Sequence, residues 1–508
     1  MFRTLIALIA ASLSVAAVAA DAPWTASETK HFIIYSKSPP ERVRDLAIDL
    51  ERYDKLIRMA TNIPEDKDST KVRIYEVDGL KEVRDAYGAG EDSPVAGFYT
   101  ANSLGPFLVT PRKTGYVGEY FDAELVRHHE YAHHMMLQYY PEAYPQWYTE
   151  GFAELIGSSK VLPDGRIGYG MPARQRGHEI AVDWAPLQEL LTKEKPWGVD
   201  PYGQGWAVTH FFTFDKKRSV EFRQYLAALN SGKSLDEAAK VFGDLNELDR
   251  EARAYVTGSS FEYRPVKVDI ALPVIQSTRT LSPGEAALIP QVVAFQDDDL
   301  NQIKKKGVRD HELAQRQRNL ERTREIVQQY PNDPYALYFL AESEYALGNY
   351  QQSQAAADRL LAINPNDVHG LARKAVVIAT LARNLPAAQK GAKLAEARDL
   401  AAKANHIDNL AALPLIAYYE TFHEAGEQAP ELAVEGLEQA VSTEPRDTHA
   451  RELLVDELAS ERKWADAIYW LGPIANDPHD SPVRESARTK MAWLKSQLGA
   501  QPATVATK

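Results

Sequence analysis

The 508-residue chain contains no cysteine. This absence excludes disulfides, thiolate metal ligands and lipid attachment through an N-terminal cysteine, so ordinary packing must hold any folded domain together. The chain also has no excess of basic residues, because 58 Lys and Arg face 71 Asp and Glu and give a formal net charge of -13. Phosphate binding needs a basic surface, so nucleic acid is disfavoured as a partner.

Long apolar runs are absent after residue 20. The single run before it, Leu5 to Ala20, follows one basic residue, Arg3, and ends in small residues ahead of Asp21. This pattern predicts a signal peptide over residues 1–20, with an uncleaved membrane anchor as the alternative. The expected localisation is periplasmic or secreted in a bacterium, with no membrane span left after cleavage.

The length predicts two or three domains, and 44% hydrophobic with 25% charged residues argues against global disorder. Strand and helix patterns follow each other through residues 21–258. Short strand patterns with Pro and Gly turns predict a small β-rich connecting module at 259–304. Residues 305–500 are helical in pattern, and residues 501–508 are expected to form a disordered tail.

Small and apolar residues recur at fixed offsets in the helical region. Ser353, Ala357, Leu360 and Pro365 are matched by Ala433, Leu437, Ala440 and Pro445. The spacing resembles the tetratricopeptide repeat, a helix-turn-helix unit of about 34 residues whose stacked copies form a solenoid with a concave binding surface. An ordinary helical bundle is the alternative.

The sequence His129-Glu130-Tyr131-Ala132-His133 has the form HExxH within a predicted helix. Residues four apart share one face of a helix, so both histidines can bind one metal ion, with Glu130 placed to take a proton from metal-bound water. The alternative is a solvated helix face with two surface histidines.

Two further segments extend this hypothesis. Glu150 follows closely enough to supply the third ligand that a catalytic zinc needs, and Glu154 lies one turn later, where it can orient a ligand histidine. These carboxylates could instead be favoured by the dipole at a helix N-terminus. Tyr202 stands at another predicted helix start, where its hydroxyl could stabilise an oxyanion or its ring could be a half-buried cap.

The segments HEYAH and WYTEGFAEL together resemble the gluzincin metallopeptidases of the peptidase MA clan, most closely the thermolysin-like catalytic domain of the aminopeptidase N family. The resemblance implies an α+β fold, with a thermolysin-like zinc peptidase domain followed by an all-α tetratricopeptide-repeat solenoid. It implies Zn²⁺ held by His129, His133 and Glu150, with Glu130 as general base and Tyr202 stabilising the transition state. No G-x-M-E-N segment precedes HExxH, so an endopeptidase is expected in preference to an aminopeptidase.

The sequence therefore predicts an exported zinc-dependent peptidase that acts on a peptide or protein, with repeats that bind a protein partner or the substrate. The first alternative is a repeat-based protein-interaction module with an inactive peptidase domain. The second is a metal hydrolase with a different substrate, because one zinc site can serve several carbonyl substrates. The sequence leaves the oligomeric state open.

Overall fold

The computed structural model describes residues 23–65, 70–102, 104–112, 123–140, 142, 144–194, 201–258, 261–445, 447–475 and 481–500. The predicted signal peptide and the predicted disordered tail lie outside the described residues. No helix of the described ranges is long and apolar enough to cross a membrane.

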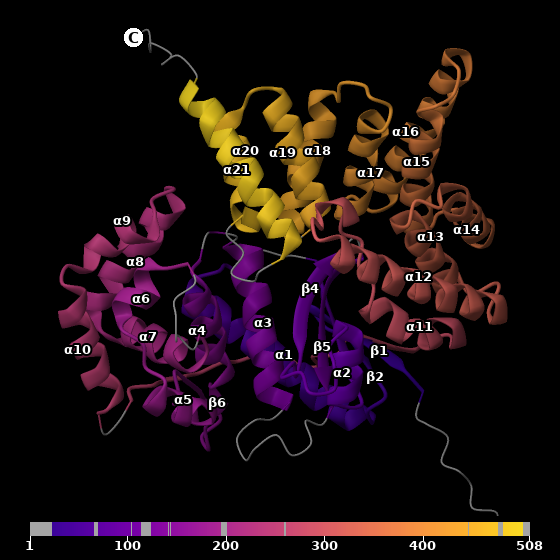
Figure 1. Cartoon of the computed structure of the whole chain (residues 1–508). Coiled ribbons are helices and arrows are strands. Elements are labelled where there is room, and N and C mark those ends of the chain that lie inside the picture. The colour runs from indigo at the N-terminus through magenta and orange to yellow at the C-terminus, as the bar shows by residue number, and fades with distance from the viewer. Residues whose placement is uncertain are drawn as a thin grey trace, which may run out of the picture.

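A six-stranded mixed sheet lies at the centre of the N-terminal part, by which we mean the described residues before the helix that begins at Pro334 (Figure 1). Its order is β4-β5-β3-β2-β1-β9, with β2, β3 and β5 parallel and the other pairs antiparallel. The strands are β1 (Thr25–Glu28), β2 (Phe32–Ser36), β3 (Val72–Val77), β4 (Phe98–Asn102), β5 (Gly105–Pro111) and β9 (Ser277–Thr280). Every residue of β5 is buried, because both faces of the sheet are covered.

One face of the sheet packs against three helices. They are α1 (Pro40–Thr61), α3 (Ala123–Tyr139) and α4 (Gln146–Gly157). Phe32, Ile34 and Ile74 from the strands share one apolar cluster with Tyr131 of α3 and Ile156 of α4. The metal-motif helix is therefore buried between the sheet and its neighbours.

A second helical group packs behind α4 and forms its own apolar cluster. Its main members are α6 (Leu187–Thr192), α7 (Gly203–Phe214), α8 (Lys216–Asn230), α9 (Leu235–Ala239) and α10 (Leu245–Val256). The chain reaches this group through short elements that border the site: β6 (Lys160–Val161), β7 (Ile167–Tyr169), η1 (Arg174–Arg176) and α5 (Gly177–Val182). The turn between β6 and β7 is the hairpin that Pro163-Asp164-Gly165 predicts.

The other face of the sheet packs against α2 and the helices that lead into the repeats. Tyr75 and Phe107 of the strands share one apolar cluster with Leu288, Leu320 and Phe339. The helices concerned are α2 (Leu80–Tyr87), α11 (Pro283–Val293), α12 (Lys306–Gln329), α13 (Pro334–Ala346) and α14 (Tyr350–Ile363). The first repeat helices and the sheet therefore form one continuous core.

The described part of the predicted connecting module, residues 261–304, does not form one β-rich unit. β8 (Arg264–Val266) pairs with β7 in a small three-stranded sheet, and β9 pairs with β1 at the edge of the main sheet. The segment continues as α11 and then as η3 (Leu300–Gln302). Its two strands, β8 and β9, each join a sheet whose other strands come from earlier in the chain. Local strand patterns cannot reveal such long-range pairing.

Antiparallel helix pairs follow, and we call α13–α21 the repeat array. Beyond α14 its helices are α15 (Val368–Ala382), α16 (Ala387–Ile407), α17 (Ala412–His423), α18 (Glu431–Thr443), α19 (Thr448–Ser460), α20 (Trp464–Ala475) and α21 (Pro482–Ala500). The small residues at the recurring offsets, such as Ser353 and Ala357, are fully buried between paired helices. Asp333, Asp367 and Asp447 each cap the first helix of a pair by accepting a backbone N–H bond. These features confirm a TPR-like repeat array in place of an ordinary bundle.

The array curves as an arc over the N-terminal part (Figure 1). Its start is continuous with the core of the sheet, and its far end returns to the side where α3 lies. The predicted fold class is wrong for the N-terminal part, because a small mixed sheet whose second face packs on repeat helices is not a thermolysin-like domain. HExxH and the segment after it specify two helices and leave the architecture around them undetermined.

Candidate metal centre

The two histidines of HExxH lie on one face of α3, which begins at Ala123 and is buried along almost its whole length. The Nε2 atoms of His129 and His133 are 3.1 Å apart. Glu150, in the second turn of α4, places Oε2 3.3 Å from Nε2 of His129 and 3.6 Å from Nε2 of His133. Three donor atoms from two helices therefore converge on one point.

These distances test whether the donors fit a zinc ion. Zinc binds imidazole nitrogen and carboxylate oxygen at about 2.0–2.2 Å in tetrahedral geometry, which puts neighbouring donors about 3.3–3.6 Å apart. The three observed separations of 3.1, 3.3 and 3.6 Å agree with one face of such a tetrahedron. Among the described residues, His129, His133 and Glu150 also form the one group of possible ligands in which all three side chains are buried.

Close backbone packing places Glu150 opposite the histidines. A methyl group built on Gly205 of α7 would lie 2.5 Å from the carbonyl oxygen of Trp147 in α4, so α4 and α7 touch through bare backbone. On the other side, Gly157 lies close enough to α3 that an added methyl would sit 3.6 Å from Cβ of His129. Gly205 thus sets the spacing between α4 and α7, and Gly157 the spacing between α4 and α3.

Glu154 lies behind His129, as its spacing predicts. Its Oε1 is 3.3 Å from Nδ1 of His129, so the carboxylate can fix the ring and leave Nε2 directed at the donor cluster. Arg176 donates to Oε1 at 2.7 Å, and Gln175 donates to Oε2 at 2.9 Å. Burial raises the pKa of Glu154, but His129 and Arg176 outweigh it and hold the pKa at about 2.

Arg176 and Gln175 are functional candidates that the sequence patterns did not reveal. Both belong to η1, the short Arg174–Arg176 turn, some twenty residues after Glu154. The guanidinium of Arg176 also lies 4.7 Å from the ring centroid of Tyr202. Only the fold brings this turn to the metal-motif helices.

The acidic surroundings favour a positive charge at the cluster. Burial lowers the pKa of His129, but hydrogen bonds to Glu150 and Glu154 outweigh it and raise the pKa to about 10. The same two carboxylates that stabilise a proton on this imidazole would stabilise a bound cation. The donor set and its charge therefore both fit a divalent metal.

Glu130 and Tyr202 flank the cluster. Glu130 is partly buried on α3, and a methyl group on Gly97 beside β4 would lie 3.5 Å from its Cγ. The ring of Tyr202 is 6.1 Å from that of His129, and the residue is 38% exposed. Burial and the carboxylates of Glu150 and Glu130 raise the pKa of Tyr202 well above its usual value, so its hydroxyl stays protonated.

The neighbouring histidines have structural roles. His128 contacts Asp49 at 2.8 Å, and His134 contacts the hydroxyl of Tyr99 at 3.0 Å. Burial lowers the pKa of His134 to about 3, so this ring is neutral. His210 lies between the hydroxyl of Tyr255 and the carbonyl oxygen of Gly170, while His178 is exposed on α5.

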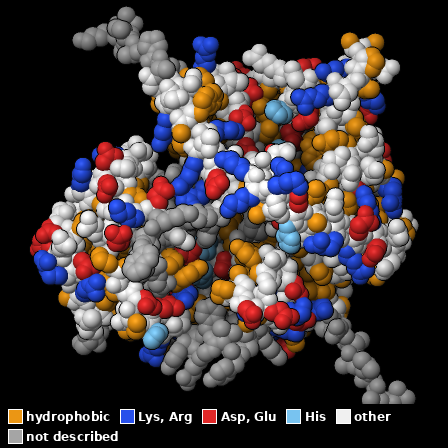
Figure 2. Space-filling view, in the orientation of Figure 1, with side chains coloured by type: hydrophobic (Ala, Val, Ile, Leu, Met, Phe, Trp, Pro, Cys, Tyr) orange, Lys and Arg blue, Asp and Glu red, His pale blue; other side chains and the backbone are white. Residues whose placement is uncertain are grey.

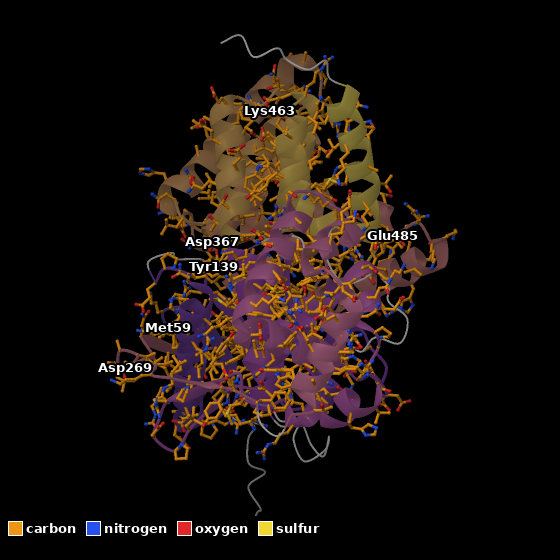
Figure 3. All side chains as sticks on the ribbon, turned by 90° about the vertical axis from the view of Figure 1, so that its left-hand side faces the viewer. Met59, Tyr139, Asp269, Asp367, Lys463 and Glu485 are labelled. Carbon is orange, nitrogen blue, oxygen red and sulfur yellow. The ribbon has the colours of Figure 1, made fainter. Side chains whose placement is uncertain are left out.

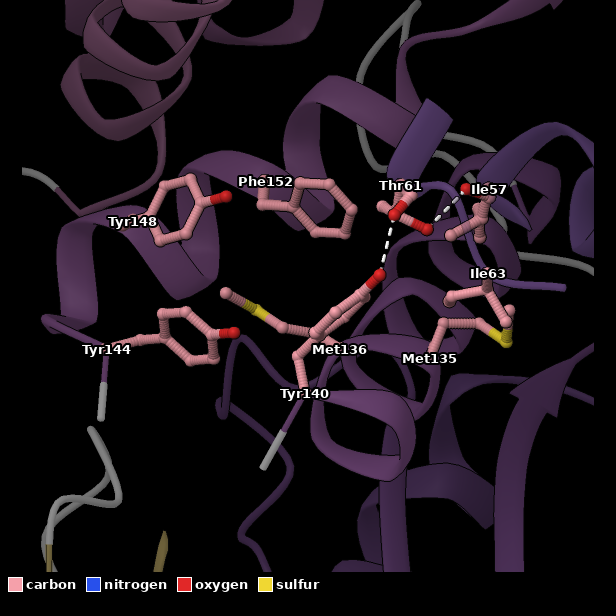
Figure 4. A pocket seen from close by; sticks show the side chains of 9 residues that line it. All are labelled: Ile57, Thr61, Ile63, Met135, Met136, Tyr140, Tyr144, Tyr148 and Phe152. Atoms are coloured by element: carbon pink, nitrogen blue, oxygen red, sulfur yellow. Dashed lines mark hydrogen bonds between the residues drawn. The ribbon is translucent and has the colours of Figure 1, made fainter. Parts of the chain in front are cut away.

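A small apolar pocket lies between α1, α3 and α4 near this centre (Figure 4). The hydroxyls of Tyr144 and Tyr148 point towards Met136 and Phe152, and Tyr140 donates to the carbonyl oxygen of Thr61 at 2.6 Å. The cavity measures about 40 Å³, room for a few water molecules, so it does not hold an organic cofactor.

Solved structures are the known proteins to which the chain is similar. No protein-family model matches the chain, and no curated protein matches it. Similar solved structures include the thermophilic TPR protein TTC0263 of Thermus thermophilus, at 20% identity over 39% of this chain and 100% of that one, with a TM-score of 0.32. A tetratricopeptide repeat protein from Parabacteroides merdae shares 14% identity over 41% of this chain and 81% of that one (TM-score 0.29). Yeast Tom70 shares 11% identity over 74% of each chain (TM-score 0.26).

These findings correct the family prediction. Two of the three similar structures are named as repeat proteins, none is named as a peptidase, and nothing in the comparisons supports a gluzincin. The predictions of a gluzincin family, of metalloprotease or hydrolase activity and of an endopeptidase are therefore wrong, and no catalytic role is assigned to Glu130 or Tyr202. The short motifs that suggested the family fit a metal-binding pair of helices equally well, and the repeat array rests on its own helix pairs and their aspartate caps.

Proposed function

We propose that the protein binds another protein, or an extended peptide segment, through the inner face of the repeat array. The observation that carries this proposal is a row of polar side chains along the first helices of successive pairs. Arg373 of α15 makes a bidentate ion pair with Glu342 of α13 at 2.9 and 2.6 Å. In the same row, His449 of α19 contacts Glu420 of α17 at 2.8 Å.

This row faces the N-terminal part. Arg73 of β3 acts electrostatically on His369 of α15, and Asp297 acts on His449. His369 and His449 are exposed to solvent, whereas Arg373, Glu342 and Glu420 are buried. The two histidines are therefore the accessible polar groups of this row, and the buried ion pair holds α13 and α15 together. Such a surface suits a polar, charged polypeptide, as solenoid proteins present to their partners.

Substitution of exposed histidines tests this surface without disturbing the core. Peptide arrays would first identify binding sequences, and dissociation constants would then be measured for His369→Ala, His449→Ala and the control His406→Ala. His406 is an exposed histidine at the end of α16, a second helix of a pair. The two inner-face variants are expected to weaken binding by about tenfold or more, a loss of about 1.4 kcal/mol. Equal effects from all three variants would locate binding elsewhere.

We further propose that His129, His133 and Glu150 hold Zn²⁺. The ion would cross-link α3 and α4, because its ligands come from both helices, and would stabilise the folded state by about 2.7 kcal/mol at a hundredfold excess over its dissociation constant. The support for this site is the agreement of the three donor separations with tetrahedral geometry.

Metal analysis after chelation and readdition of zinc tests this second proposal. One zinc per chain is expected for the wild type and for His178→Ala, which changes an exposed histidine on α5. His133→Ala and Glu150→Ala should lose the metal and the rise in melting temperature that it brings. A wild type that retains no zinc, or variants that retain all of it, would refute the assignment.

A further inference from the structure

The two ends of the repeat array contact the N-terminal part in different ways. At its start, α13 and α14 share an apolar cluster with strands β3 and β5. At its far end, the apolar cluster of α17–α21 contains only residues of the array itself. The far end is therefore attached to the N-terminal part by polar contacts, while the near end is fixed by buried apolar surface.

These polar contacts gather at the turn between α18 and α19, which we call the closing turn (residues 443–448). The Nε2 of Gln138, at the end of α3, donates to the carbonyl oxygen of Thr443 at 2.6 Å. The hydroxyl of Thr70, just before β3, lies 3.2 Å from Oε1 of Glu444. Thr448 contacts Oδ1 of Asp298, in the segment that leads to η3, at 3.4 Å. Three separate segments of the N-terminal part thus meet one turn of the array.

Two further polar contacts join the array to the N-terminal part. Gln302 of η3 donates to both carboxylate oxygens of Glu452 on α19, at 3.0 and 2.8 Å. Arg488 of α21 pairs with Glu194 at 2.7 Å, but both side chains are largely exposed, so this pair contributes little. Each of these hydrogen bonds and ion pairs can be replaced by water when the array moves away.

We propose that the closing turn is a pH-sensitive clasp, which holds the far end of the repeat array against the N-terminal part in acid and releases it as the pH rises. Carboxylates concentrate there: Glu444, Asp447 and Glu452 from the array, and Asp297 and Asp298 from the N-terminal part. The cations that face them are Arg73, Arg316, His449 and Lys490, and three further acids, Glu312, Glu420 and Asp456, lie at the edge. Arg446 of the same turn lies outside the described residues.

The titration of the closing turn gives the direction of its pH dependence. Burial, with the charge of Asp447 added, raises the pKa of Glu444 to about 7. A raised pKa in the closed form means that protonation favours closure, so the contact is strongest in acid and is lost as the pH rises through about 7.

The size of the effect follows from the difference in pKa between the closed and open forms. If the pKa of Glu444 returns to its usual value of 4.5 in the open form, the closed-to-open ratio falls by about 30-fold between about pH 5.5 and about pH 8.5. Opening would free the inner face of the array. This consequence for partner binding rests on the proposed function, whereas the motion itself does not.

The absence of cysteine allows the motion to be measured directly. Met59 on α1 and Lys463, just before α20, are exposed and lie on the N-terminal part and on the array (Figure 3). Spin labels on Met59→Cys and Lys463→Cys would report the distance between the two parts at about pH 5.5 and about pH 8.5. Hydrogen exchange of the closing-turn amides, corrected for intrinsic rates, detects opening even when the open form is rare.

Closing-turn protection is expected to fall by about 30-fold over this pH range in the wild type. Glu444→Gln keeps an oxygen for Thr70 without the titration, so most of the pH dependence should disappear and the clasp should stay closed. The matched control is Glu435→Gln, which removes the same charge from an exposed position on α18. Protection that does not change with pH in the wild type, or a Glu444→Gln profile equal to that of Glu435→Gln, would overturn the proposal. Neither measurement uses a partner, so failure of the clasp and failure of partner binding remain distinguishable.

Discussion

Substitution of Gly205 by alanine should separate the helices that hold the metal cluster in place. The added Cβ would lie 2.5 Å from the carbonyl oxygen of Trp147, whereas ordinary contact begins at 3.4 Å, so α4 and α7 must move apart by about 0.9 Å. The oxygen belongs to the backbone and cannot rotate away. Overpacking of this kind costs about 1–3 kcal/mol, and the better helix propensity of alanine returns about 0.5–1 kcal/mol.

The net loss is up to about 2.5 kcal/mol, and it lowers the melting temperature by about 1 °C per kcal/mol in a chain of 508 residues. Gly391 provides a matched control, because it lies inside α16 and a methyl group there would meet nothing within 4 Å. Gly391→Ala should therefore stabilise the protein by about 0.4–1 kcal/mol. Calorimetry of both variants gives the comparison, and a Gly205→Ala protein at least as stable as Gly391→Ala would refute the close packing of α4 on α7.

Two other substitutions test particular contacts. Glu154→Gln leaves all three proposed zinc ligands in place but weakens the contact that orients the ring of His129. Calorimetric titration should therefore show a loss of zinc affinity of roughly 10–100-fold, the usual effect of removing such a carboxylate. An unchanged affinity would mean that this carboxylate only fills space. Arg373→Ala leaves Glu342 buried without its cation and should lower the free energy of unfolding by about 3–5 kcal/mol in denaturant titrations, whereas Arg373→Met with Glu342→Leu should recover most of the loss. A single and a double variant of equal stability would show that the pair itself contributes little to folding.

The sequence predicts local features of this protein well. HExxH places two histidines on one helix face, and the small residues near 353 and 433 mark where paired helices pack. These patterns depend on residues within one or two turns of each other.

What the sequence did not predict depends on contacts between distant segments. Arg176 reaches Glu154 only because η1 folds back over α4. Likewise, β8 and β9 are placed by pairing with β7 and β1, which lie far away in the chain. The family prediction failed for a related reason, because the fourteen residues of HEYAH and WYTEGFAEL specify how two helices meet and say little about the sheet beside them. The clasp needs three segments of the N-terminal part and one turn of the array, and no periodicity in the chain marks it.

The pairing of β1 with β9 has a consequence for how the chain is made. Thr25–Glu28 lies between β2 and a strand that begins at Ser277, about 250 residues later in synthesis. At about 5–20 residues per second, the ribosome needs on the order of 10–50 s to supply that neighbour. During this interval one edge of β1 has unpaired backbone groups, which are a template for pairing with another chain. The newly made protein is therefore most vulnerable to aggregation before residue 280 emerges, and we expect a chaperone to bind near its N-terminus during that time.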